Sequence, residues 1–146
     1  MMQPPQRKFP NLVGLGKITT PFGGQTKYEK FHPGIDIANA KGTPIKAPVS
    51  GQVVSAEGSK EAGDASYGNS AMIKDGQGNF HNFGHLDSTN VRPGQTITEG
   101  QTVGTMGNTG ASYSPSGKGD GTHLDYRIVS AYGKYKNPKN YVNKLT

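Results

Sequence analysis

The sequence predicts an all-β protein with little helix, built as a single antiparallel β-sheet domain folded on itself. The 146 residues include 22 glycines and 10 prolines, which favour tight turns, and only 31% of the residues are hydrophobic. The apolar residues form short runs between these turns, and no amphipathic helix of normal length appears. Low-complexity disorder is the competing interpretation of so much glycine and proline. The alternation of glycines with apolar runs argues against it.

Four short segments in the first half of the chain are expected to be extended. Turn-forming residues such as Asn39–Gly42 separate them. The predicted strands are Lys17–Gly23, Phe31–Ala38, Pro44–Pro48 and Gly51–Ala56.

The second half continues this pattern with a hairpin and three further extended pieces. Asn69–Lys74 and Phe80–Leu86 flank a turn at Asp75–Asn79, as in a β-hairpin. The other predicted strands are Thr96–Ile97, Thr102–Met106 and a strand through His123 that ends at Val129. The segment Asn137–Tyr141 predicts one helical turn or an irregular cap.

The length fits one domain with a core and is too short for two. Residues 1–16 are expected to form a loose N-terminal arm, and residues 17–146 the folded domain. Two long polar stretches, residues 57–68 and 107–121, are rich in glycine and serine. We expect them to be surface loops on one side of the sheet that wall a groove.

The composition narrows the classes of partner and of metal ligand. There is no cysteine, so a metal would have to be held by His, Asp or Glu. The net charge of +6 favours anionic partners, but the lysines are scattered and no nucleic-acid-binding motif is found, so neither nucleic acid nor membrane is predicted as a partner. No segment reaches the ~18 to 20 apolar residues of a membrane span. The polar start Met1–Lys8 has no signal-peptide h-region, so delivery by another route is expected.

Two short motifs combine imidazoles with carboxylates. In His32-Pro33-Gly34-Ile35-Asp36, proline and glycine exclude a helix, and an extended segment would place His32 and Asp36 on the same face. His123 and Asp125 have the i, i+2 spacing that also shares one face of a strand. Each motif alone has little specificity, since surface histidines near turn aspartates are common. Together they predict a shared metal ion.

The remaining histidines lie in Phe80–His85. Strand alternation places residues 81, 83 and 85 on one face, so His85 and also His81 could meet His123. Such a cluster has the inventory of a hydrolytic zinc site, with nitrogen and oxygen ligands, an open position for water and imidazoles for proton transfer. For His81 the favoured interpretation is structural, as a partly buried strand residue with a backbone partner.

A series of segments in a fixed order resembles the lysostaphin-type, LytM-like zinc metallopeptidases, which cleave peptidoglycan cross-bridges and stem peptides. The resemblance covers nearly everything from residue 17 to residue 129. The matching segments are Ile18–Gly23, Phe31–Ala38, Gly42–Pro48, Gly51–Val54, Gly84–Leu86, Gly100–Gly104, Gly107–Gly110 and Thr122–Ile128.

The resemblance implies a metallopeptidase domain over residues 17–146, with a groove between loops and Zn²⁺ as the cofactor. His32 and Asp36 match the family's H-x-x-x-D zinc ligands, and His85 and His123 match its catalytic histidines. The family's other motif is H-x-H, and Asp125 occupies the position of its second histidine, the third zinc ligand. A carboxylate can bind zinc, but it is shorter than imidazole and adds negative charge. With Asp36 and Asp125 both ionised, the charge of Zn²⁺ is formally neutralised, so its water should be acidified less.

The resemblance therefore predicts a zinc endopeptidase acting on peptidoglycan peptides at the bacterial cell wall, in an extracellular, periplasmic or virion-associated location. A phage lysin or a tail-associated hydrolase fits, as does an excised catalytic domain, acting as a monomer or within a larger assembly. The alternative is a catalytically degenerate domain that binds peptidoglycan or serves as a structural module. The peptide bond that is cleaved does not follow from the sequence.

Overall fold

The computed structural model describes residues 12, 14–26, 29–57, 67–110, 112 and 120–142, and this part of the chain is almost entirely β. The predicted fold class is confirmed, because the strands form one antiparallel sheet. The strands are β1 (Lys17–Thr20), β2 (Ile35–Ala38), β3 (Pro44–Lys46), β4 (Gly51–Glu57), β5 (Asn69–Asp75), β6 (Phe80–Thr89), β7 (Thr96–Ile97), β8 (Thr102–Met106), β9 (Leu124–Val129) and β10 (Tyr135–Lys136). One short helix, α1 (Lys139–Val142), follows them.

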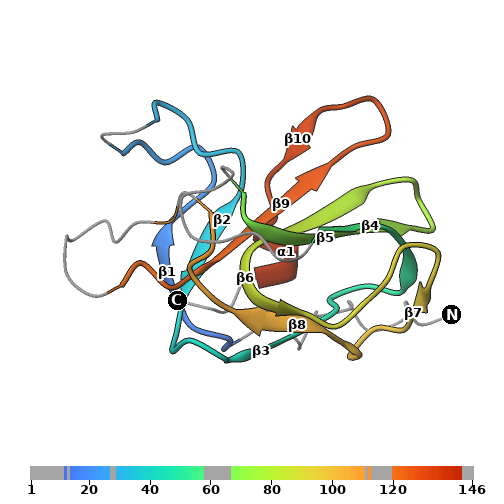
Figure 1. Cartoon of the computed structure of the whole chain (residues 1–146). Coiled ribbons are helices and arrows are strands. Elements are labelled where there is room, and N and C mark those ends of the chain that lie inside the picture. The colour runs from blue at the N-terminus through green and yellow to red at the C-terminus, as the bar shows by residue number, and fades with distance from the viewer. Residues whose placement is uncertain are drawn as a thin grey trace, which may run out of the picture.

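The strand β6 is the centre of the sheet. The main path runs β1-β2-β9-β6-β5-β4-β7, while β8 pairs with β3 and with β6, and β10 pairs with β9 (Figure 1). The first half of β6 lies between β5 and β9, and its second half pairs with β8. The sheet therefore folds over on itself along β6.

A β-bulge lies where β6 changes partners. Ala71 pairs with Phe83 and Asn69 pairs with Leu86, so two residues advance on β5 while three advance on β6. His85, within this extra step, has a positive φ of 61°, the left-handed conformation that non-glycine residues seldom adopt. The bulge bends β6 and interrupts the alternation of its side chains.

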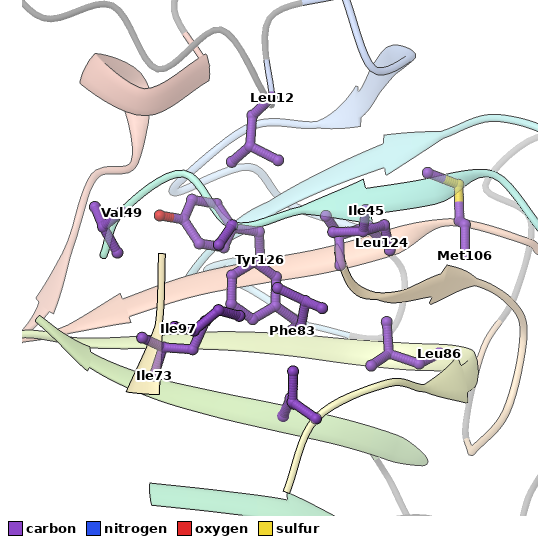
Figure 2. Close-up of a cluster of buried hydrophobic side chains, with 14 of the residues drawn as sticks. Leu12, Ile45, Val49, Ile73, Phe83, Leu86, Ile97, Met106, Leu124 and Tyr126 are labelled. Atoms are coloured by element: carbon purple, nitrogen blue, oxygen red, sulfur yellow. The ribbon is translucent and has the colours of Figure 1, made fainter. Parts of the chain in front are cut away.

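The core lies on one face of β2, β9, β6 and β5. Ile35 is opposite Tyr126 and Phe83 is also opposite Tyr126, so these side chains share a face. The Phe83 and Tyr126 rings stack with centroids 5.2 Å apart, and both residues are fully buried (Figure 2). The core is completed by side chains of β3, β7 and β8, among them Ile45, Ile97 and Met106.

Most predicted strands occur at their expected places, with differences at their ends. β1 ends at Thr20, before the predicted Gly23, and β6 extends past Leu86 to Thr89. The short strand β10 was not predicted, because its two residues, Tyr135 and Lys136, are both exposed and give no apolar pattern. α1 confirms the expected helical turn near the end of the chain.

The N-terminal boundary and the long loops lie largely outside the described residues. This applies to residues 1–11 of the expected arm, to 58–66 of the first loop and to 113–119 of the second. Leu12 is described, and its side chain is fully buried in the core. Packing into the domain therefore begins before residue 17. Within the described residues, no helix is long and apolar enough to cross a membrane.

Replacing Phe83 with alanine should destabilise the domain by about 3–5 kcal/mol, because the change removes a fully buried ring that stacks on Tyr126. The free energy of unfolding in urea measures this loss. Val54→Ala is the matched control, since Val54 on β4 is 38% exposed and should change stability little. A loss below about 1 kcal/mol for Phe83→Ala would contradict the assignment of this ring to the core.

Candidate functional site

Three buried side chains, two from neighbouring strands and one from the segment before them, meet on the face of the sheet opposite the core. Asp36 of β2 is directly opposite Asp125 of β9, and His32 lies just before β2. One potential ligand atom from each of these residues lies within 4.8 Å of the others. We refer to His32, Asp36 and Asp125 as the metal-ligand triad. The structure thus brings together the three residues that the sequence predicted as ligands.

The approach of His32 to Asp36 depends on a bend and not on the extended segment expected from the sequence. The chain bends at Pro33 and Gly34, and β2 begins only at Ile35. A fully extended run would separate residues i and i+4 by about 13 Å, which is too far for a shared ion. Any side chain at Gly34 would collide with the backbone carbonyl of Tyr126, so this close approach requires glycine.

Two acceptor atoms face each other at the centre of the triad. His32 Nδ1 donates to Glu29 Oε1 at 2.7 Å, so in the neutral imidazole Nε2 carries a lone pair. This Nε2 lies 2.9 Å from Asp36 Oδ1. Both atoms are buried, and neither forms a hydrogen bond within the described part of the chain. Such an arrangement fits a cation between them.

The electrostatics around His32 also favour positive charge. Burial lowers the pKa of His32, but the close contact with the Asp36 carboxylate, together with Asp125 and Glu29, outweighs burial and raises the pKa above its ordinary value. Like charges directly opposite on neighbouring strands are destabilising unless they are compensated. Asp36 and Asp125 form such a pair, which a bound cation would stabilise.

A residue of the same strand, Arg127, holds the Asp125 carboxylate by hydrogen bonds. Arg127 is two residues along β9 on the same face, and its Nε and Nη2 donate to Asp125 Oδ1 and Oδ2 at 2.9 and 2.8 Å. The Tyr67 hydroxyl donates to the backbone carbonyl of Asp125. Neither Arg127 nor Tyr67 was predicted as part of the site. The i, i+2 spacing of Asp125 and Arg127 could have indicated the first, whereas no signal in the sequence indicated the second.

His85 and His123 stand beside the triad with their rings close together, their centroids 4.7 Å apart. His85 Nδ1 donates to the Thr109 carbonyl, and His123 Nδ1 donates to the Gly121 carbonyl, each at 2.7 Å. Both residues therefore present Nε2 to the site, where it lies 3.9 Å from Asp125 Oδ2 for His85 and 3.6 Å from Asp36 Oδ1 for His123. Burial lowers the pKa of His85, and the neighbouring His123 lowers it further.

His81 does not join this cluster, because the bulge places His85 on the opposite face from His81 and Phe83. His81 is fully buried among core residues, where its Nε2 donates to Asp75 Oδ2 at 2.8 Å. Its Nδ1 accepts from the Tyr126 hydroxyl at 2.7 Å. The expectation that residues 81 and 85 share a face was therefore wrong. His81 does have the expected structural role, but its hydrogen-bond partners are side chains and not the backbone group that was expected.

An apolar pocket continues the site along β9. Asp125, Arg127 and Val129 lie on one face of this strand, and the pocket begins at Arg127. It has a volume of about 480 Å³, and its lining residues are Tyr67, Met72, Phe80, Asn82, Arg127, Val129 and Tyr135. The carboxylates and the pocket therefore lie on one continuous surface.

The sequence is similar to those of known proteins. A sequence model described as Peptidase family M23 matches residues 30–138. Murein hydrolase activator NlpD of Escherichia coli strain K12 is 36% identical over 129 residues, which are 87% of this chain and 29% of that protein. The chain thus spans less than a third of the length of this relative.

Solved structures share the fold. The catalytic domain of the prophage-encoded M23 protein EnpA from Enterococcus faecalis, solved as a point mutant, has a TM-score of 0.69 and 28% identity, and the match covers 86% of this chain and 90% of that one. The antimicrobial peptidase lysostaphin from Staphylococcus simulans has a TM-score of 0.70 at 23% identity, over 96% of this chain and 53% of that one. The second likeness concerns the fold alone.

Replacing Gly84 with alanine should destabilise the protein by about 1–3 kcal/mol, because the added methyl group would overlap the ring of Tyr67. Gly76→Ala is the matched control, since nothing lies within 4 Å of a methyl group at that turn position. Urea unfolding of both variants measures the difference. Equal stability of the two variants would mean that Tyr67 does not pack against Gly84 as described.

Proposed function

The chain belongs to peptidase family M23, and from this premise we propose that it is a zinc-dependent endopeptidase that hydrolyses peptide bonds in bacterial peptidoglycan. The observation that carries the proposal is the metal-ligand triad, in which two buried acceptor atoms face each other 2.9 Å apart beside a second carboxylate. Two further imidazoles point into the same space. A domain that only binds or supports would have no physical need of this combination.

The donor set of the triad suits zinc. One imidazole nitrogen and two carboxylates are ligands found in catalytic zinc sites, which hold the ion by three protein groups and leave a position open. Glu29 would fix the tautomer and orientation of His32 from behind, as outer carboxylates do at such sites. When bound, zinc would polarise the scissile carbonyl and lower the pKa of a water.

His85 and His123 would carry the proton transfers. The carbonyl groups of Thr109 and Gly121 hold both Nδ1 protons, so each Nε2 is free to accept or donate a proton in the site. One imidazole would take the proton of the attacking water at Nε2. The other would donate a hydrogen bond to the developing oxyanion and then protonate the leaving amine.

The apolar pocket would receive part of the substrate. A peptide lying along β9 would pass over Asp125 and Arg127 and reach the pocket beyond. This would place a peptide bond at the triad while a neighbouring side chain occupies the pocket. The partner would then be an extended peptidoglycan peptide. The positive charge of the chain would favour an anionic cell wall.

The proposed setting is the bacterial cell wall, outside the cytoplasm or on a virion. A phage lysin or tail-associated hydrolase is supported by the similarity to a prophage-encoded M23 protein. The chain covers only 29% of the NlpD relative, so a role within a larger protein or assembly is equally compatible with the proposal.

A second candidate is a catalytically degenerate domain that binds or organises the wall. Two observations favour it: both oxygens of Asp125 are engaged by Arg127, and the NlpD relative is named an activator of murein hydrolases. Under this hypothesis the groove would bind peptide without turnover. Zinc content and lysis separate the two candidates.

Replacing His85 with alanine should leave zinc binding intact and slow the lysis of purified peptidoglycan by about 10²–10⁴-fold, because the change removes a proton-transfer group and leaves the three proposed ligands in place. Zinc content by elemental analysis and the clearing of a peptidoglycan suspension provide the two measurements. Tyr132→Ala, a change at a residue that is 96% exposed on the β9–β10 turn, serves as the control. A wild-type protein without zinc, or unchanged lysis by His85→Ala, would contradict the proposal.

Filling the apolar pocket should weaken substrate binding without affecting the metal. Val129→Trp would occupy part of the 480 Å³ volume, and we expect KM for soluble peptidoglycan fragments to rise by about tenfold, with zinc affinity unchanged. Initial rates at several fragment concentrations measure the effect, and Val54→Trp, at an exposed position of β4, is the matched control. An unchanged KM would place the substrate elsewhere.

A further inference from the structure

Arg127 and Asp125 form a closely matched ion pair at the edge of the triad. The guanidinium donates two parallel hydrogen bonds, from Nε to Oδ1 at 2.9 Å and from Nη2 to Oδ2 at 2.8 Å. This fork arrangement fixes the plane of a carboxylate as well as its position. The Asp125 side chain is 4% exposed and that of Arg127 is 26% exposed, so solvent weakens the pair less than it would at the surface.

Tyr67 holds the pair in place. Its ring lies 4.9 Å from the Arg127 guanidinium carbon, within the range of a cation–π contact. Its hydroxyl donates to the backbone carbonyl of Asp125. Arg127 and the backbone of Asp125 are therefore both anchored to one side chain.

The fork leaves Asp125 able to bind a cation. An ionised carboxylate has about four acceptor positions, two on each oxygen, and the two donors of Arg127 occupy one on each oxygen. The remaining positions are available to the triad, where a ligand atom of Asp125 lies within 4.8 Å of those of His32 and Asp36. Without the fork, repulsion from Asp36 directly opposite would favour rotation of the Asp125 carboxylate away from the centre.

The charge of the pair is also significant. Two carboxylates would cancel the charge of a divalent cation, whereas the guanidinium restores one positive charge. The divalent cation, Asp36, Asp125 and Arg127 together then carry one net positive charge. A divalent cation held by one carboxylate and two neutral imidazoles carries the same net charge. Asp125 with Arg127 is thus equivalent in charge to a neutral ligand.

We propose that Arg127 is a positioning residue that holds Asp125 as the third metal ligand and balances its charge, so that the two residues act as one neutral ligand unit. This inference rests on the proposed zinc-dependent function. It assigns to Arg127 a role that depends on the aspartate at position 125.

A double-mutant cycle on zinc affinity tests this dependence. The zinc dissociation constants of the wild type, Arg127→Met, Asp125→His and the double variant are measured by competition with a chromophoric chelator. Arg127→Met should weaken zinc binding by about 10–100-fold when Asp125 is present. In the Asp125→His background the same change should alter zinc affinity by only about twofold, because a neutral imidazole has no carboxylate for the guanidinium to hold.

Two further variants keep the test decisive. Arg127→Lys retains the charge and loses the fork, so its zinc affinity should lie between those of the wild type and Arg127→Met, even if the methionine variant folds poorly. Arg92→Met, at an exposed turn residue, is the matched control and should bind zinc as the wild type does.

The outcomes separate this inference from the proposed function. An equal effect of Arg127→Met in both backgrounds would overturn the inference, because Arg127 would then act only on the fold. Tighter zinc binding by Arg127→Met would also overturn it, since Arg127 would then compete with the metal for Asp125. A wild-type protein that binds no zinc would contradict the proposed function itself.

Discussion

The pairing of Asp36 with Asp125 across β2 and β9 is the constraint on which the rest of the site depends. Two buried carboxylates directly opposite each other would destabilise an ordinary sheet. Arg127 offsets the charge of Asp125, and the imidazoles of His32 and His123 lie beside Asp36. The same register places Ile35 and Ile37 in the core, so a slip by one residue would move the carboxylates into the core and the isoleucines out of it. Core packing thus fixes the geometry of the site.

The bulge in β6 has a comparable role for His85. Regular alternation would place His85 with His81 and Phe83 among core residues. The left-handed conformation at His85 costs roughly 1–2 kcal/mol for a non-glycine residue, and it turns the His85 side chain to the opposite face of the sheet. Hydrogen bonds from the His85 backbone to Tyr67 and from its ring to Thr109 offset the strain. A locally unfavourable backbone is retained here because it brings an imidazole to the triad.

Much of the fold followed from the sequence, since turn residues and short apolar runs marked most of the strands. The triad His32, Asp36 and Asp125 was also expected from motif spacing and family resemblance, although the bend at Pro33 and Gly34 that joins the first two was not. Alternation failed at residues 81 and 85, because a bulge depends on pairing with β5 and leaves no local pattern. Partners such as Tyr67 come from distant segments, which spacing within one motif cannot identify.

The arrangement along β9 links chemistry to recognition. Asp125, Arg127 and Val129 succeed one another on one face, so a side chain of the triad, its ion-pair partner and the floor of the apolar pocket share one rigid strand. Under the proposed function, the residues of this strand that select a peptide would also position it for cleavage. Arg127 contacts both regions, since it binds Asp125 and lines the pocket. Changes in the pocket that displace Arg127 would therefore reach the proposed metal ligands, whereas changes at Val129 need not.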